Sequence, residues 1–218
     1  MQPGDDVGAT YVSGNVEQLL GHRADAFRRV PSFWAEQVHP DERPRALAAL
    51  SHLPDRGHLS MEYRFRHDDG SYRWMRDERR LLRNAEGEPS EIVGCWFDVT
   101  ERKQGEERQQ LLLRAIEQGA NAVIITNAAG QIEYVNPRFT RTTGYTQEEV
   151  LGKNPRILRS GETPDTVYAD MWRTILAGED WRGTICNKKK DGSNYWESST
   201  ISPVLNGNGV LTHFVAVK

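Results

Sequence analysis

The sequence predicts an α+β protein made of two copies of one fold, each an antiparallel sheet of about five strands with short helices on one face. Three observations support this prediction: an internal repeat, the same order of strand and helix patterns in both copies, and a helical stretch that joins them. At 218 residues, the chain is long enough for two domains of about 100 residues each.

The internal repeat aligns the two copies. The run Tyr11-Val12-Ser13 matches Tyr134-Val135-Asn136. Further along, Asp69-Gly70-Ser71 matches Asp191-Gly192-Ser193 at a spacing one residue shorter, and a tryptophan follows each turn. A single insertion or deletion over about sixty residues indicates two copies of one supersecondary unit.

The second copy begins with two strands. The apolar run 122–126 predicts a buried strand, and residues 131–135 predict another after a turn. Residues 137–151 predict short helices, and Thr146 and Glu149 have the spacing of a capping box.

A longer helix and three strands complete this copy. Thr163 followed by Pro164 predicts an N-cap and a helix that runs to about Leu176. Strands are expected at about 181–190, 194–205 and 210–217. Two strands, short helices and three antiparallel strands describe a sheet with helices on one face.

The first copy has the same order but begins abruptly. Helices are expected near 15–21 and 41–53, and strands near 58–67, 72–83 and 90–99. The strand that opens the second copy would fall at positions 0 to 4 here, so the opening strand is missing. Either the sequence begins inside this domain or a partner chain supplies that edge, which leaves open a strand-swapped dimer.

The stretch 100–117 contains no proline and is rich in Gln, Glu, Arg and Leu, so it predicts a helix between the copies. Leu112, Leu113 and Ile116 form a short apolar stripe, which we expect to dock on its own domain. The domains are therefore expected at 1–100 and 119–218, with a linker helix at 101–118.

Composition narrows the class of protein. The net charge is −3 and no apolar run approaches the ~20 residues of a membrane span, so we expect a cytoplasmic protein with no nucleic-acid binding and no membrane insertion. No metal-ligand spacing and none of the nucleotide-binding or hydrolase motifs appear, which argues against an enzyme. Cys95 and Cys186 lie in apolar runs and are expected to be free, buried thiols.

The stretch from Trp181 to Trp196 contains several side chains that are suited to binding a ligand. Asp191-Gly192 between two strand patterns predicts a hairpin. Asn187 offers a donor and an acceptor, the tryptophans offer flat surfaces, and lysines offer positive charge. This combination suits a flat, polar-edged, phosphate-bearing molecule.

The order of elements, and the run Asp98-Val99-Thr100-Glu101-Arg102-Lys103 after the last strand of the first copy, resemble the PAS sensor family. The resemblance covers nearly the whole chain. It implies two PAS domains joined by a linker helix and expected to form a homodimer. The first copy, with Ser32 to Arg43, resembles PAS domains without a fixed cofactor.

The second copy resembles a narrower group, the FAD-binding PAS domains of the nitrogen-fixation redox regulator, the aerotaxis receptor and the methane-monooxygenase sensor kinase. The matching runs are Gly152 to Pro164, Val167 to Trp172 and Trp181 to Trp196. The resemblance implies FAD contacts from eight residues: Asn136, Arg159, Ser160, Glu162, Trp172, Trp181, Asn187 and Lys188.

Several functions follow from this resemblance. The first is redox sensing through FAD, with light as an alternative input, relayed to an output domain such as a histidine kinase in the full-length protein. Pro155 stands where light-oxygen-voltage relatives have their reactive cysteine, so a cysteinyl adduct is excluded there. A haem sensor is disfavoured because His213 is the only histidine of this copy. The main alternative is a cofactor-free dimerisation or interaction module.

Overall fold

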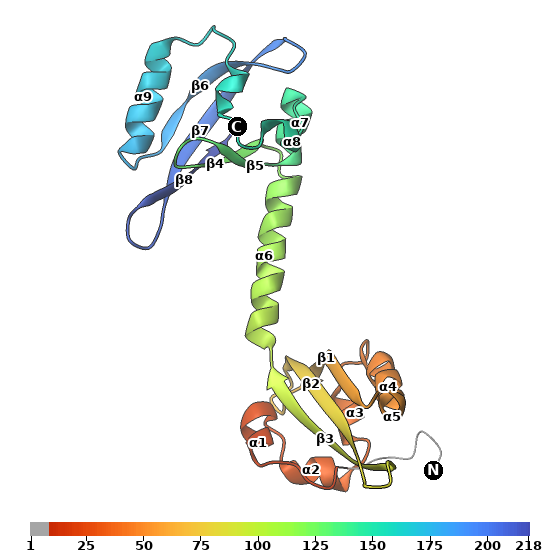
Figure 1. The fold of residues 1–218 in the computed structure, drawn as a ribbon. Helices are drawn as coiled ribbons and strands as arrows, with labels where there is room; N and C mark the ends of the chain where they lie inside the picture. Colours follow the sequence, from red (N-terminus) through yellow and green to blue (C-terminus); the bar gives the residue numbers. More distant parts are fainter. Residues whose placement is uncertain (1–8) are drawn as a thin grey trace. The chain divides into compact units, whose positions relative to one another are not determined.

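A computed structural model describes residues 9–218 and divides into two units, one ending at Arg108 and the next beginning at Gln109. Each unit has its own antiparallel sheet, of three strands in the first and five in the second (Figure 1). The predicted α+β class, with short helices beside antiparallel sheets, is confirmed.

The first unit contains short helices followed by three strands. These are α1 (Asn15–Leu20), α2 (Ala24–Arg29), α3 (Phe33–Gln37), α4 (Arg43–Ser51), α5 (Leu53–Arg56), β1 (His58–Arg66), β2 (Tyr72–Arg83) and β3 (Pro89–Asp98). The sequence did not predict α2 and α3, because helices of five or six residues show no readable periodicity.

The sheet of the first unit has the order β1-β2-β3, with both pairs antiparallel. Within residues 9–57, only Val38 makes a β-bridge to it, opposite Phe65. Positions 0 to 4, where the opening strand would fall, lie outside the described residues. Among the described residues this sheet therefore has three strands, rather than the expected five or so.

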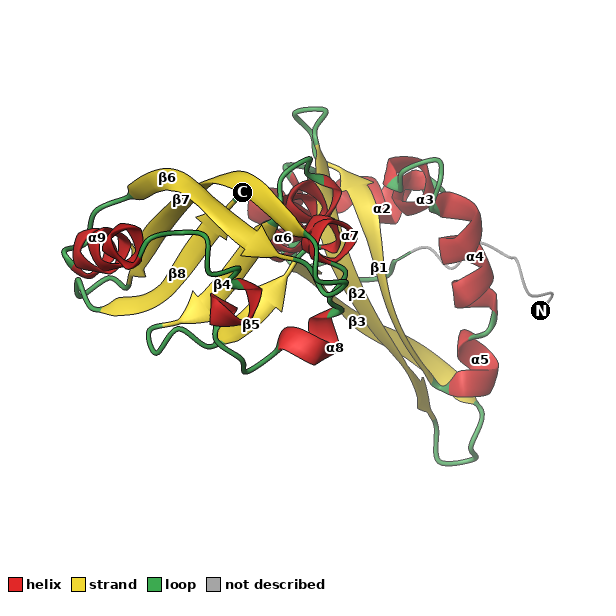
Figure 2. Cartoon of the chain, turned by 90° about the horizontal axis from the view of Figure 1, so that it is seen from above, coloured by secondary structure: helices red, strands yellow, loops and turns green. Residues whose placement is uncertain are grey.

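The second unit contains five strands and several helices. These are β4 (Val123–Asn127), β5 (Ile132–Val135), α7 (Pro137–Thr143), α8 (Gln147–Val150), η1 (Pro155–Leu158), α9 (Asp165–Leu176), β6 (Trp181–Lys188), β7 (Asn194–Leu205) and β8 (Leu211–Val217). The strand order is β5-β4-β8-β7-β6, and α9 packs against β6 and β7 (Figure 2).

Local signals in this unit are mostly confirmed. The capping box of Thr146 and Glu149 is present in both directions, and Gly192 has φ +89° in the predicted turn. The predicted N-cap at Thr163 is wrong. The helix begins at Asp165 without a side-chain cap, because the hydroxyl of Thr163 instead accepts a hydrogen bond from the backbone N–H of Cys186 at 2.8 Å.

The helix α6 spans Thr100–Gln118, as predicted. Its apolar stripe does not dock as a whole: Leu112 and Leu113 are exposed, and only Ile116 is half-buried. The prediction that both cysteines are buried is also wrong, since Cys186 is buried but Cys95 on β3 is exposed. Within residues 9–218, every helix is too short or too polar to cross a bilayer.

The ion pair between Glu42 and Arg64 makes the stability of the first unit depend on pH. The carboxylate of Glu42 accepts hydrogen bonds from Nε and Nη2 of Arg64, at 3.0 and 2.6 Å. Burial raises the pKa of Glu42, but the hydrogen bonds and charge of Arg64 outweigh it and hold this pKa below 4.5. The stability that this pair contributes is therefore present above the unfolded-state pKa and is lost as pH falls through the lower folded-state pKa.

We expect Glu42→Gln to destabilise the first unit by about 1 kcal/mol near neutral pH, with the difference from wild type shrinking below about pH 4. Hydrogen–deuterium exchange of α4 and β1 across a pH series measures this. A difference that stays constant to about pH 3 would contradict the assignment.

Candidate functional site

The inner face of the β6–β7 hairpin collects polar side chains. Asn187 lies opposite Tyr195, and Gly183 lies opposite Ser199, so that alternate residues of both strands point to the same face. Asn187 and Ser199 are buried, at 4% and 1% exposure. The amide predicted to contact a ligand therefore lies inside the domain.

Asn187 belongs to a buried charged network. Its Nδ2 donates to Oε1 of Glu197, which also accepts a hydrogen bond from Nζ of Lys218 at 2.6 Å. The Glu197 and Lys218 side chains are only 9% and 8% exposed. Burial and the nearby Glu197 carboxylate raise the pKa of the Tyr195 phenol further above neutral pH.

Four hydroxyl groups in this unit are buried without a hydrogen-bond partner. They belong to Tyr134 on β5, Tyr168 on α9, and Tyr195 and Ser199 on β7. A buried hydroxyl without a partner costs about 1–3 kcal/mol, so each of these groups is expected to bond to water or to another polar group. The apolar core of this unit is also split into two separate clusters, one including Phe139 and the other Trp181.

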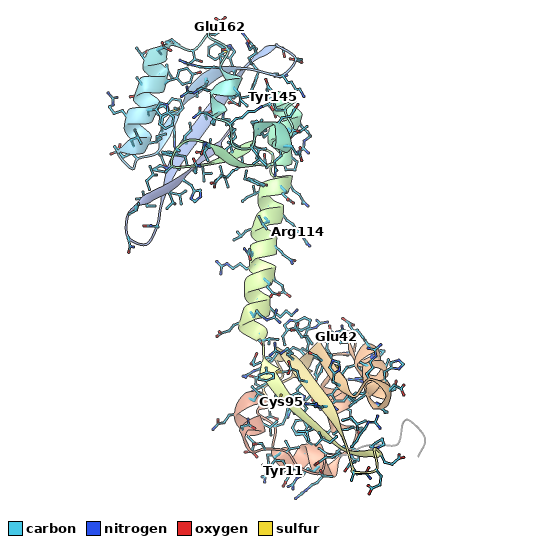
Figure 3. The ribbon with its side chains drawn as sticks, in the orientation of Figure 1. Tyr11, Glu42, Cys95, Arg114, Tyr145 and Glu162 are labelled. Carbon is cyan, nitrogen blue, oxygen red and sulfur yellow. The ribbon has the colours of Figure 1, made fainter. Side chains whose placement is uncertain are left out.

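The loop before α9 is fixed to the edge of β6. Oγ of Ser160 donates to the carbonyl of Cys186 at 2.7 Å, and Arg159 forms a β-bridge with Asn187. The Arg159 guanidinium lies 4.2 Å from the centre of the Tyr168 ring. Glu162 is exposed in the same loop (Figure 3). This arrangement brings the backbone of Arg159 and the side chain of Ser160 to the edge of β6 at Asn187 and Cys186.

The two tryptophans lie elsewhere. Trp181 is buried, and its Nε1 donates to Asp170 of α9 at 3.1 Å. A Cβ at Gly183 would lie 2.3 Å from the Trp181 ring, so only glycine leaves room for this flat packing. Six residues of strand place Trp181 about 20 Å from Asn187. Trp172 is partly exposed and packs edge-on against Phe214.

The remaining predicted residues have other surroundings. The Asn136 side chain caps α7 and makes four backbone hydrogen bonds, accepting from Val123 and Phe139 and donating to Ile116 and Asn121. These four hydrogen bonds use both donor hydrogens and both acceptor positions of the Asn136 side-chain amide. Lys188 is exposed at the end of β6. An open surface pocket of about 430 Å³, near Glu117 and Tyr134, is lined by none of the eight predicted residues.

Comparison with known proteins identifies the fold. Models of the PAS fold match residues 9–95 and residues 110–217. The chain belongs to the PAS family. It contains two tandem PAS domains, which are sensory modules of signal transduction.

The chain is similar to a curated regulatory protein and to a curated receptor. The chain is 39% identical over 130 residues to the nitrogen fixation regulatory protein of Klebsiella oxytoca, covering 60% of this chain and 25% of that protein. It is 29% identical over 93 residues to the aerotaxis receptor of Escherichia coli, covering 43% of this chain and 18% of the receptor. The chain thus spans about a quarter or less of these relatives. An RNA-binding light-oxygen-voltage receptor aligns over 94% of this chain and 90% of its own, at TM-score 0.48 and 16% identity.

At one interior position that is equivalent in the two PAS domains, the first has a hydrogen-bonded carboxylate and the second has a hydroxyl without a partner. The spacing that matches Trp74 with Trp196 also matches Asp77 of the first domain with Ser199 of the second. Asp77 is fully buried and accepts hydrogen bonds from Tyr63 at 2.7 Å and from Arg79 at 2.8 Å. Trp34 donates to Tyr63 at 2.8 Å, so the first domain pairs these polar groups internally. Ser199 lacks such a partner.

Several residues of the candidate site in the second domain were not predicted: Thr163, Tyr168, Tyr195, Glu197, Ser199 and Lys218. The alternation Tyr-Trp-Glu-Ser-Ser over 195–199 places polar groups on one strand face and was a signal available from the sequence. Lys218 carried no such signal, because its partner Glu197 lies 21 residues away on another strand.

Proposed function

We propose that the second PAS domain binds FAD and senses redox state, with light as an alternative input. The strongest support is the buried amide of Asn187 with the hydroxyls of Tyr195 and Ser199 on the same face of the hairpin, set against the internally paired network of the first domain. The sequence motifs around these residues resemble FAD-binding PAS domains. FAD would supply the reversible electron and proton transfer.

The residues divide into two groups along the proposed cofactor. Asn187 and Tyr195 would hydrogen-bond the polar edge of the ring, since amide and hydroxyl groups both donate and accept. Ser199 lies four residues, or about 13 Å, farther along β7 and would face another part of the cofactor. Arg159 and Lys188 would offset phosphate charge near the surface. Trp181 lies too far from Asn187 to contact the same edge, so with Trp172 it would pack against the other end of FAD.

The ion pair between Glu197 and Lys218 connects this site to the end of the last strand, β8. Lys218 directly follows β8, and its ion pair with Glu197 holds that end of the chain next to Asn187. A change in hydrogen bonding at Asn187 would alter this ion pair. We propose that a cytoplasmic homodimer relays the change through helices to an output domain of the full-length protein, while this region itself is not catalytic.

Reconstitution with FAD tests the proposal. We expect the purified protein to retain FAD after gel filtration, to show flavin absorption bands, and to lose the visible band reversibly on reduction. A folded protein that retains no flavin would contradict redox sensing through FAD and would favour the cofactor-free interaction module. The Cys186→Ser variant should retain FAD, since no thiol adduct is involved.

A further inference from the structure

The strand β3 leaves one edge of the first sheet open. Within residues 9–218, β3 pairs with β2 alone. The equivalent strand of the second domain, β8, pairs with β7 on one side and with β4 on the other. The same fold within this chain therefore covers this edge with an antiparallel strand, and the first sheet has a place for one.

The backbone groups at this edge can be assigned. Val99 donates its N–H to Trp74, so by antiparallel alternation Val93, Cys95 and Phe97 bond to β2. The N–H and C=O groups of Ile92, Gly94 and Trp96 consequently point to the open edge. They are equivalent to those of Phe214, Ala216 and Lys218, which face β4.

The side chains of β3 are unusually apolar for an open edge. Ile92, Val93 and Phe97 are 40%, 49% and 41% exposed, and Cys95 is exposed beside them (Figure 3). The strand's charged residues, Glu91 and Asp98, and its only proline, Pro89, lie towards the two ends, so the stretch between Ile92 and Phe97 carries no charge and no proline. Monomeric proteins protect long edges with charges, prolines or bulges, and an apolar edge without these pairs readily with another strand.

We propose that a second copy of this chain covers the edge, with β3 of each copy pairing antiparallel across a two-fold axis at Cys95. Two identical strands related by a two-fold axis are necessarily antiparallel, which is the orientation of β4 against β8. This inference specifies a surface for the proposed homodimer and does not depend on FAD.

The register follows from side-chain complementarity. Centring the pair at Cys95 places Val93 opposite Phe97 of the other copy, a favourable cross-strand pair of β-branched and aromatic residues. It also places Trp96 opposite Gly94, where a large ring covers a glycine. The two Cys95 residues then occupy a non-hydrogen-bonded position, with their Cα atoms about 4.5 Å apart.

Thiol cross-linking tests the surface. A short bis-maleimide, or mild copper–phenanthroline oxidation, should link two chains at low protein concentration, with and without FAD. Cys95→Ser should abolish the link, and Cys186→Ser should not. A dimer by sedimentation that does not cross-link would overturn the surface while leaving the homodimer. If the protein is a monomer and Cys95 does not react with a thiol reagent, residues of the same chain cover the edge. If the protein is a monomer and Cys95 does react, the edge is uncovered. Either result overturns the inference.

Paired charges test the register. Val93→Lys with Phe97→Lys places like charges opposite each other and should weaken the dimer at least about tenfold. Val93→Glu with Phe97→Lys places opposite charges across the axis and should restore most of that loss. Leu205→Lys with Val210→Lys, at exposed positions of the second domain, is the matched control. If Leu112→Lys on α6 dissociates the dimer while both β3 variants leave it intact, the helix and not β3 forms the interface.

Discussion

Asn187→Ala is expected to weaken FAD binding by about 100-fold. The substitution removes a buried amide from the site, so the polar edge of the ring would be enclosed without its partner. A site built to hydrogen-bond a polar group loses about 2–3 kcal/mol when that pair is broken, which corresponds to this fold-change. The Glu197 carboxylate also loses its hydrogen bond from Asn187.

The matched control is Asn194→Ala, the same change at an exposed position on the adjacent strand. Titration with FAD, followed by quenching of flavin fluorescence, measures both variants, and circular dichroism verifies that each is folded. Asn187→Asp keeps the shape but exchanges a donor for an acceptor beside Glu197, and should bind FAD about as weakly as the alanine variant. Equal affinities for Asn187→Ala and Asn194→Ala would contradict the assignment of Asn187.

The second large effect is expected in the first PAS domain, where Asp77→Asn should lower the free energy of unfolding by about 3–5 kcal/mol. Asp77 is fully buried and neutralises Arg79, which is itself mostly buried. Removing one partner of a buried ion pair leaves the other charge uncompensated, and that cost exceeds the value of the hydrogen bond itself. The Tyr63 hydroxyl, whose pKa burial raises, also loses its carboxylate acceptor.

Glu78→Gln is the control, since Glu78 is the next residue of β2 and pairs with Arg76 on the exposed face. Hydrogen–deuterium exchange of the full chain separates the domains: protection of β1 and β2 should fall in Asp77→Asn, while protection of β6 and β7 should not change. Similar exchange in β1 and β2 of the two variants would show that Asp77 is not a principal stabilising group.

The open edge strand β3 is followed directly by the helix α6. The strand ends at Asp98, and α6 begins two residues later. Because the proposed pairing is antiparallel about Cys95, the two Asp98 residues would lie about 20 Å apart. The two α6 helices would therefore start at opposite ends of the paired strands.

The sequence by itself determined the α+β class, the tandem repeat, the linker helix, the capping box at Thr146 and the turn at Gly192. These features depend on residues within a few positions of one another, whose periodicity and hydrogen bonding are local. The tertiary structure alone decided which buried polar groups meet. Lys218 reaches Glu197, Thr163 bonds Cys186 instead of capping its helix, and Asp77 joins Tyr63 and Arg79. These contacts depend on strand register and on which elements the fold brings together, and no local pattern encodes them.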